Sequence, residues 1–375
     1  MIDDFSLIRT LDDIPAERWD ALTQGHPLLS HAFLNALHTT GCASLKTGWD
    51  PHFLVLQDQG QLRAAMPMYV KYHSRGEYVF DHAWARAFMQ HGLTYYPKLL
   101  AAVPFTPVPG PRLLAHSHED RVQLARAAAA LAAQNGLSSL HILFPDDADQ
   151  KALREAGFMF RETVQFHWHN NGYQNFDDFL ACLNQEKRKK IRQDRKKVAA
   201  ADIEYQWLRG EQITPADLEF FYQCYAQTYF EHGNPPYLNP EFFHTIHHAL
   251  PDQLLLVMAL RGNSRVACAL NIIGNKRLYG RYWGTTEFVS GLHFETCYVQ
   301  AIAWCIENGF DVFEGGAQGE HKLSRGMLPV KTWSAHWVSD ARFARAIADF
   351  VDEETRAVDH YAEALESHSP FKKKA

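Results

Sequence analysis

The chain has 375 residues, of which 46% are hydrophobic and 21% are charged. This balance is typical of a globular protein with two or three domains, and it excludes a largely disordered chain and a disulfide-stapled miniprotein. The longest uninterrupted apolar run, residues 254–260, has seven residues, whereas a membrane-spanning helix needs about 20. No basic segment followed by an apolar stretch opens the chain, so we expect no transmembrane segment, no secretory signal and a cytoplasmic protein.

The net charge of −6 is unevenly distributed along the chain. Residues 186–197 hold eight basic and two acidic residues, a local charge of +6 that leaves −12 for the rest of the chain. A segment with this excess of positive charge favours a partner that carries phosphates, such as a coenzyme, a nucleotide-sugar or RNA. The alternative is a helix whose charges only face solvent.

Cysteine and histidine usage gives no sign of a metal site. The six cysteines are scattered without a Cys-x-x-Cys pair, and the 21 histidines form no His-Glu-x-x-His motif. We therefore expect reduced, mostly buried thiols and no bound metal.

Hydrophobic patterns and turn signals predict an alternation of helices and strands. In the first half they predict helices within 12–40, strands 53–56 and 62–70, an extended Pro-rich stretch 104–111, helix 119–134, strand 137–144, helix 148–156 and strand 158–168. In the second half they predict a basic helix at about 177–200, helix 217–229, strands 253–260, 266–273 and 278–283, helix 293–307, and strands 311–313 and 333–338.

The two halves share an order of elements. Each has an Ala-rich helix that stops at Asn-Gly (residues 135–136 and 308–309), then a strand, a segment that ends in glycine, and a His-Trp pair. The distance from that first glycine to the tryptophan is 32 residues in one half and 28 in the other. We infer a duplication. It predicts an α/β (α+β) protein with related domains at 1–172 and 201–375, linked by a basic helix at 173–200.

The densest polar cluster, residues 314–326, directly follows a predicted strand. Its three central glycines permit close backbone approach to a ligand, and acidic, basic and imidazole side chains surround them. The corresponding stretch of the first half lacks the glycines and the basic residues, which indicates that the second half carries the site. The alternative is a solvated loop. The candidate residues are Glu314, Gln318, Glu320, His321, Lys322 and Arg325.

A carboxylate, Glu295, lies in line with the apolar stripe of helix 293–307. Burial would raise its pKa and suit it to act as a general base for an amine, although it could equally be an acid that caps the helix. His293 could carry a proton or cap the same helix. Tyr237, Arg281 and Trp283 could line a substrate pocket, although aromatic residues on a strand are more often core.

Several of these segments together resemble a known family. Lys187-Arg188-x-x-Ile191-Arg192, Leu292-His293-Phe294-Glu295 and the loop from Gly316 to Gly326 resemble the FemAB-like branch of the GNAT superfamily, in particular bacterial predicted N-acyltransferases of the peptidoglycan biosynthesis/recognition type. The resemblance covers nearly the whole chain. It implies tandem GNAT-like domains, each a mixed, mostly antiparallel sheet flanked by helices.

The resemblance also implies transfer of an acyl group to an amine. The donor would be an acyl-CoA or, alternatively, an aminoacyl-tRNA used on a peptidoglycan precursor. Glu295 would take the amine proton, and Lys322 corresponds to a lysine near the transferring centre of FemAB-like proteins. Ser290 and Gly291 occupy the place of the GNAT pyrophosphate loop, although its usual glycine pattern is absent. With Lys187, Arg188 and Arg192 they are the expected contacts of the donor. A module that binds a cell-wall precursor without chemistry is a further alternative.

Overall fold

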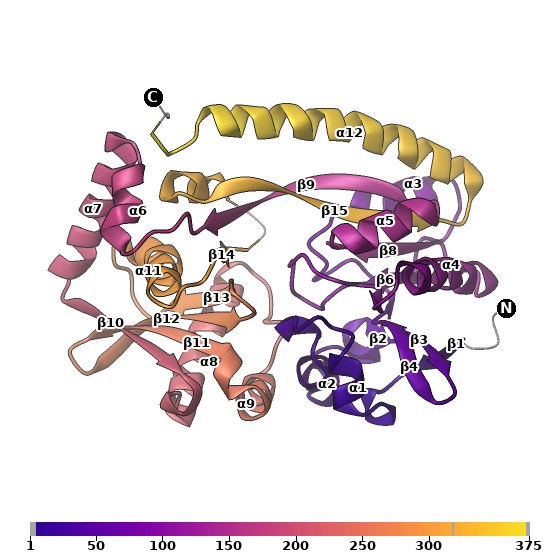
Figure 1. Ribbon diagram of the computed structural model, residues 1–375, viewed down its shortest axis with the longest axis horizontal. Helices are drawn as coiled ribbons and strands as arrows, with labels where there is room; N and C mark the ends of the chain where they lie inside the picture. Colours follow the sequence, from indigo (N-terminus) through magenta and orange to yellow (C-terminus); the bar gives the residue numbers. More distant parts are fainter. Residues whose placement is uncertain (1–4, 317–318, 373–375) are drawn as a thin grey trace. The chain divides into compact units, whose positions relative to one another are not determined.

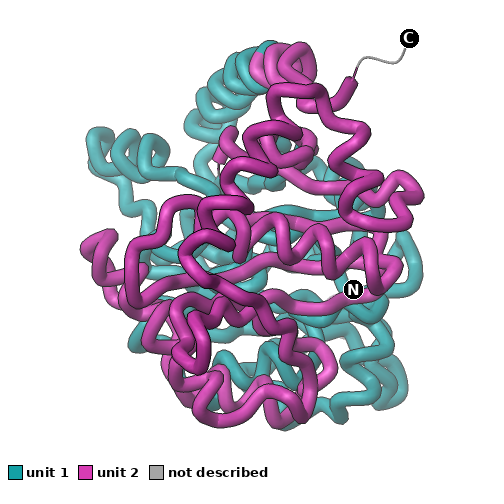
Figure 2. The backbone as a smooth tube through the Cα atoms, turned by 90° about the vertical axis from the view of Figure 1, so that its left-hand side faces the viewer, with its two compact units in different colours: residues 1–163, 331–360 teal, residues 164–330, 361–375 magenta. Residues whose placement is uncertain are grey.

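The computed structural model describes residues 5–316 and 319–372 (Figure 1). By internal contacts the chain divides into two compact units (Figure 2). Unit 1 comprises residues 1–163 and 331–360, and unit 2 comprises residues 164–330 and 361–375.

Unit 1 contains an antiparallel sheet in the order β1-β3-β4-β7, and a mixed set of strands in the order β2-β5-β6-β8-β15, in which β15 spans Leu328–Val338. The strands are β1 (Phe5–Ile8), β2 (Trp49–Pro51), β3 (Phe53–Asp58), β4 (Gln61–Met66), β5 (Tyr69–Lys71), β6 (Lys98–Ala101), β7 (Leu114–Ala115) and β8 (Ser139–Leu143). The helices are α1 (Ala16–Asp20), α2 (His31–Thr39), α3 (His82–Gln90), α4 (His118–Gln134) and α5 (Asp147–Glu155). Ser117 caps α4 by accepting a hydrogen bond from the Asp120 amide.

Unit 2 is built on strands in the order β10-β11-β12-β13-β14-β9. Neighbouring strands are antiparallel except for β13 and β14. The strands are β9 (Met159–His169), β10 (Ile203–Arg209), β11 (Leu254–Arg261), β12 (Ser264–Ile273), β13 (Arg277–Thr285) and β14 (Val312–Glu314). The helices are α6 (Phe176–Cys182), α7 (Gln185–Ala200), α8 (Pro215–Glu231), α9 (Pro240–Ala249), and a continuous helical run of α10 (Leu292–Phe294), the π-helical turn η6 (Glu295–Val299) and α11 (Gln300–Glu307).

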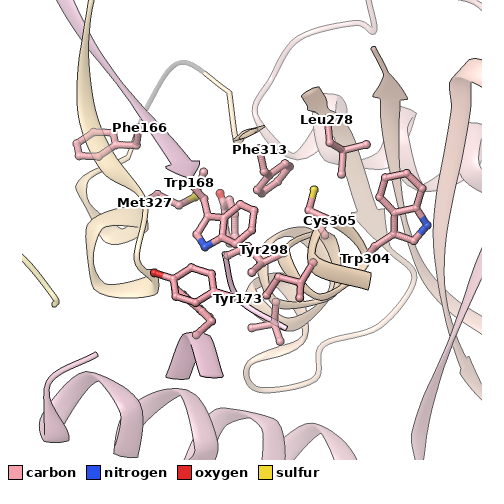
Figure 3. Close-up of a cluster of buried hydrophobic side chains, with 14 of the residues drawn as sticks. Phe166, Trp168, Tyr173, Leu278, Tyr298, Trp304, Cys305, Phe313 and Met327 are labelled. Atoms are coloured by element: carbon pink, nitrogen blue, oxygen red, sulfur yellow. The ribbon is translucent and has the colours of Figure 1, made fainter. Parts of the chain in front are cut away.

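Helices cover both faces of the unit 2 sheet. Figure 1 shows α8 and α9 on one face and α11 on the other. Helix α8 packs so closely that a Cβ at Gly284 of β13 would lie 2.0 Å from the Cys224 carbonyl oxygen. On the α11 side, buried aromatic and aliphatic residues such as Trp168, Tyr298, Phe313 and Met327 form the core (Figure 3). The expected fold, a mixed and mostly antiparallel sheet flanked by helices, is confirmed.

The element order inferred for the two halves is present. In the first half α4, β8, α5 and β9 follow one another, and in the second α11, β14, the 3-10 helix η7 (Glu320–Arg325) and β15 (Leu328–Val338). The units, however, are not the two halves of the sequence. In unit 1, β8 pairs with residues 334–338 of β15, and in unit 2, β14 pairs with residues 167–169 of β9. Each unit thus takes its closing strand from the other half.

The second domain was expected to span residues 201–375, but part of the C-terminal segment belongs to unit 1. Helix α12 (Ala341–Ser367) was not predicted, and its first part belongs to unit 1. There Ile347 and Val351 pack with Trp84 and Phe88 of α3. Burial of this apolar stripe is the reason that residues 331–360 join the first unit rather than the second.

The basic segment expected to link the domains lies inside unit 2, and it is two helices rather than one. Helix α6 ends at Cys182, and Asn184 caps α7 by accepting a hydrogen bond from the Lys187 amide. The predicted apolar seam of Leu180, Leu183, Ile191 and Val198 is buried, which anchors the segment in the core of unit 2. None of the described helices is both long and apolar enough to span a membrane.

Candidate functional site

A small cavity opens in unit 2 where β13 and β14 separate. The two strands pair in parallel from Arg277–Val312 to Tyr279–Glu314, and the pairing ends there. Gly280, the next residue of β13, and Gly315, the residue after β14, line a cavity of about 100 Å³. The space is tightly packed, because a Cβ at Gly315 would lie 2.5 Å from the Met327 side chain. The remaining lining residues are Ala269, Leu270, Asn271, Arg281, Tyr282, Trp283, His293, Cys297, Tyr298 and Phe313.

A β-bulge lies in the strand wall of this cavity. Tyr282 pairs with Leu270 and Gly280 pairs with Asn271, so Arg281 has no counterpart on β12. Opposite this wall, the helical run contains the π-helical turn η6. Bulges and π-turns re-aim side chains and are common beside active sites.

His293, on α10, provides an imidazole at the cavity. Its ring lies against Trp283, with 4.5 Å between the ring centroids. Burial, together with the nearby His321 imidazole and the cations Arg325 and Lys322, lowers the pKa of His293 to about 4. The imidazole is therefore neutral at pH 7 and able to accept a proton.

Lys322, on η7, supplies a buried cation close to the same residues. Its side chain is 2% exposed, and Nζ donates a hydrogen bond to the Gly316 carbonyl oxygen at 2.9 Å. Burial lowers the pKa of Lys322 to about 8, and the neighbouring Cys297 opposes that shift. Burial raises the pKa of Cys297 well above its usual value, so this side chain is a neutral thiol.

The other described residues of the polar loop have contacts of their own. The Tyr298 hydroxyl and His321 Nε2 lie 3.3 Å apart, and the Arg325 guanidinium stacks 3.7 Å above the Phe294 ring. Glu320 accepts a hydrogen bond from the Tyr361 hydroxyl. Gln318, expected at this site, lies outside the described residues.

Glu314 ends β14 and is buried. Its carboxylate accepts a hydrogen bond from Arg277 Nη1 at 2.6 Å, and His167 Nε2 lies 4.0 Å from its other oxygen. The expected substrate-binding residue is thus engaged with a partner on β13, the strand that forms the cavity wall.

Glu295 lines a different pocket from His293. This second pocket, of about 610 Å³, lies between α7, β10 and the helical run and includes Arg192 and Lys196. Arg195 Nε lies 3.3 Å from the Glu295 carboxylate, and Gln300 donates a hydrogen bond to it. Burial raises the pKa of Glu295 against the opposing effect of Arg195.

The start of the helical run packs against α7. Gly291 has a φ of +88°, and a Cβ there would lie 3.4 Å from the Asp194 carbonyl oxygen of α7. The Leu292 amide already donates to the Val289 carbonyl oxygen. Ser290 and Gly291 therefore stand beside the basic helix, where the resemblance places the phosphates of a donor.

A third pocket, of about 390 Å³, is lined by residues of α7 that include Arg188 and Arg192. Arg192 also borders the pocket of Glu295. Lys187 pairs with Glu186 at 2.9 Å. The expected donor contacts therefore extend along one helix rather than converge on Lys322.

Of the three residues expected to line a substrate pocket, two line the first cavity and one does not. Arg281 and Trp283 line the first cavity. Tyr237 instead contacts Tyr229 of α8 with 5.6 Å between ring centroids, and it is not among the described residues that line that cavity.

Unit 1 has a corresponding pair of parallel strands, but the space beyond their paired residues is filled. Strands β6 and β8 pair in parallel, and beyond them Gly110 continues next to β8. The Gly110 amide donates to the Phe144 carbonyl oxygen, and the Asp146 amide donates to the Gly110 carbonyl oxygen. The Pro-rich stretch 104–111 thus occupies the place that is open in unit 2.

Sequence reasoning missed three polar residues that line the cavity: Asn271, Cys297 and Tyr298. Asn271 left a signal, because it is the one polar residue in the apolar run 266–273. Among residues 5–316 and 319–372 no group of three potential metal-ligating side chains comes together.

Comparison with known proteins identifies the family. The chain matches the FemAB-like family, described as peptidoglycan biosynthesis/recognition, over residues 10–373. It belongs to this family. No curated protein sequence matched the chain.

Solved structures with the same fold have little sequence identity to this FemAB-like chain. FemX superposes with a TM-score of 0.55 at 12% identity, covering 92% of this chain and 100% of FemX. The C-terminal domain of a putative lysylphosphatidylglycerol synthetase from Agrobacterium fabrum has a TM-score of 0.55 at 11% identity, covering 92% and 96% of the two chains. L-PGS from Bacillus licheniformis has a TM-score of 0.52 at 10% identity, covering 92% and 97%.

Proposed function

We propose that this FemAB-like protein is an N-acyltransferase that moves an acyl or aminoacyl group from an activated donor to an amine of a peptidoglycan precursor. The observation that carries the proposal is the cavity at the split between β13 and β14, with a neutral imidazole and a buried ammonium beside it. Acyl transfer uses a proton acceptor, because the amine must lose a proton. It also uses a hydrogen-bond donor or positive charge, because the carbonyl oxygen develops negative charge.

In the proposed reaction the amine nitrogen attacks the acyl carbon. The bond from that carbon to the sulfur of a thioester, or to the oxygen of an ester, then breaks. The ammonium of Lys322 stabilises the oxyanion, and His293 accepts the proton that leaves the amine. Glu295, expected from the sequence as the base, instead holds Arg195 in its own pocket, and in this proposal it positions the basic helix.

A transfer assay with purified protein tests the function. The acceptor is UDP-N-acetylmuramoyl pentapeptide with a free side-chain amine, and the donors, in separate reactions, are radiolabelled acetyl-CoA and charged aminoacyl-tRNA. Label on the acceptor with either donor supports the proposal. Binding of the precursor with no transfer from either donor would favour the alternative of a recognition module without chemistry.

The rate should depend on pH through the pKa of Lys322. Burial lowers that pKa to about 8, so the cation is lost as the pH rises through about 8, rather than near 10.5 as for an exposed lysine. We expect kcat/KM to fall on this alkaline side. Because arginine stays charged, the Lys322→Arg variant should lose this alkaline limb even if its rate is lower. An unchanged limb in the variant would assign it to another group.

Aminoacyl-tRNA is the second candidate donor, and the start of the helical run favours it. The Leu292 amide is already used by Val289, and α7 packs against Gly291. The Leu292 amide is thus not available to a coenzyme pyrophosphate, whereas the exposed cations of α7 match the phosphate backbone of a nucleic acid.

Charge reversal on α7 tests this donor. The double variant Arg192→Glu, Lys196→Glu should weaken binding of tRNA and reduce the slope of log affinity against log salt by about one to two units. The matched control is Arg209→Glu, Lys276→Glu, which makes the same charge change at exposed positions of unit 2. Filter binding at several salt concentrations measures both. Equal slopes for the two double variants would remove α7 from the donor site.

A further inference from the structure

Asn271 has a buried polar side chain that lacks a hydrogen-bond partner for its amide nitrogen among the described residues. The residue is 2% exposed, and its Nδ2 has no hydrogen-bond partner among the described residues. A buried amide N–H without an acceptor costs free energy, so native structures rarely retain one unless a ligand or a water molecule completes it.

The position of Asn271 connects it to the cavity at the strand split. On β12 it pairs with Gly280 of β13, next to the bulge at Arg281. It lines the cavity together with His293 and Cys297 of the helical run. Two residues earlier, Ala269 lines the same cavity, as expected for alternate residues on one face of a strand.

The surroundings indicate what kind of group would satisfy the amide. Nδ2 is a donor, so its partner must be an acceptor, such as a carbonyl oxygen. The amine that attacks must keep its lone pair for the acyl carbon, which leaves the acyl group as the natural acceptor. A cavity of about 100 Å³ suits a small group rather than a coenzyme or a nucleotide.

We propose that Asn271 binds a carbonyl oxygen of the transferred acyl group and thereby holds that group at the strand split. This role rests on the proposed acyl-transfer function, and it makes the cavity the acyl pocket of the enzyme. Discrimination between the loaded and the unloaded donor would then come from Asn271, whereas the basic helix would hold the part of the donor that both forms share.

The test compares probes that differ only by the acyl group. One pair is acetyl-CoA and CoA, and the other is 3′-(L-alanylamido)-3′-deoxyadenosine and 3′-amino-3′-deoxyadenosine. Calorimetry with the full-length protein measures the preference for the acylated member of each pair. In the Asn271→Leu variant, which has a similar volume and no donor, we expect that preference to fall about ten- to hundredfold. Affinity for the unacylated member should stay the same.

A melting curve of the unliganded variant separates this role from a structural one. Since leucine removes the unpartnered amide, Asn271→Leu should melt at the same temperature as the unmodified protein or higher. A second pair of variants, Asn271→Thr and Asn271→Val, differs only by a hydroxyl and should show the preference recovering with the hydroxyl.

Three results would overturn the proposal, and each shows which part of it fails. An unchanged acyl preference in Asn271→Leu would overturn the role of Asn271 alone. A marked loss of melting temperature with unchanged preference would assign Asn271 to structure. If the unmodified protein binds neither probe pair, then the proposed acyl-transfer function fails together with the acyl pocket.

Discussion

Replacing Lys322 with alanine is expected to lower kcat by about 10²- to 10³-fold, the usual loss when one oxyanion donor is removed. The ammonium is buried, donates one hydrogen bond to the Gly316 carbonyl oxygen and keeps two further N–H groups for a ligand. Because its charge acts in a site from which water is largely excluded, little of its effect is screened. Turnover in the transfer assay measures the loss, and KM should change much less.

The matched control is Lys276→Ala. Lys276 also donates a hydrogen bond from Nζ to a backbone carbonyl, that of Gly309, at 2.9 Å, but it is exposed. Its removal should leave kcat unchanged. A Lys322→Ala enzyme that melts like the unmodified protein and retains full turnover would contradict the site at the strand split.

Replacing Lys98 with methionine is expected to destabilise the protein by about 3–5 kcal/mol, because it leaves buried carboxylates without their cation. Lys98 is the first residue of β6 in unit 1 and is fully buried. Its Nζ donates to Glu77 at 2.8 Å, to Ser74 at 2.9 Å, and to Asp81. Burial alone would lower the pKa of Lys98, but the combined attraction of Glu77 and Asp81 raises it.

The network around Lys98 extends through hydrogen-bonded side chains, so the loss cannot be absorbed locally. Tyr95 donates to Asp81 at 2.6 Å and lies 3.0 Å from His141, whose Nδ1 is 2.6 Å from that of His336. Strands β8 and β15 carry these two histidines. Removal of the cation should therefore loosen the pairing that closes unit 1.

Urea unfolding followed by circular dichroism measures this effect, and Arg126→Ala is the control. Arg126 pairs with Glu155 at 3.7 Å on the surface of unit 1, and both side chains are more than half exposed. Loss of such a surface pair should cost less than about 1 kcal/mol. If Lys98→Met unfolds at the same urea concentration as Arg126→Ala, the network does not stabilise unit 1.

The sequence by itself determined most of the local structure. Asn-Gly stops, apolar strands and the buried seam of the basic segment are local signals, because each depends on the intrinsic preferences of a few neighbouring residues. The same holds for the polar loop around Lys322, where glycines and charged residues lie within a dozen positions. The lone Asn271 in an apolar strand was a readable signal as well.

Only the tertiary structure decided which strands close each unit and which residues meet. The exchange of β9 and β15 between the two halves, and the association of the first part of α12 with unit 1, depend on contacts between residues more than a hundred positions apart. Glu295 and Lys322 are both buried carriers of charge, yet Glu295 lines the pocket beside α7, whereas Lys322 donates to the Gly316 carbonyl oxygen of the polar loop. The lowered pKa of Lys322 likewise follows from burial, which non-local packing sets and no short sequence pattern encodes.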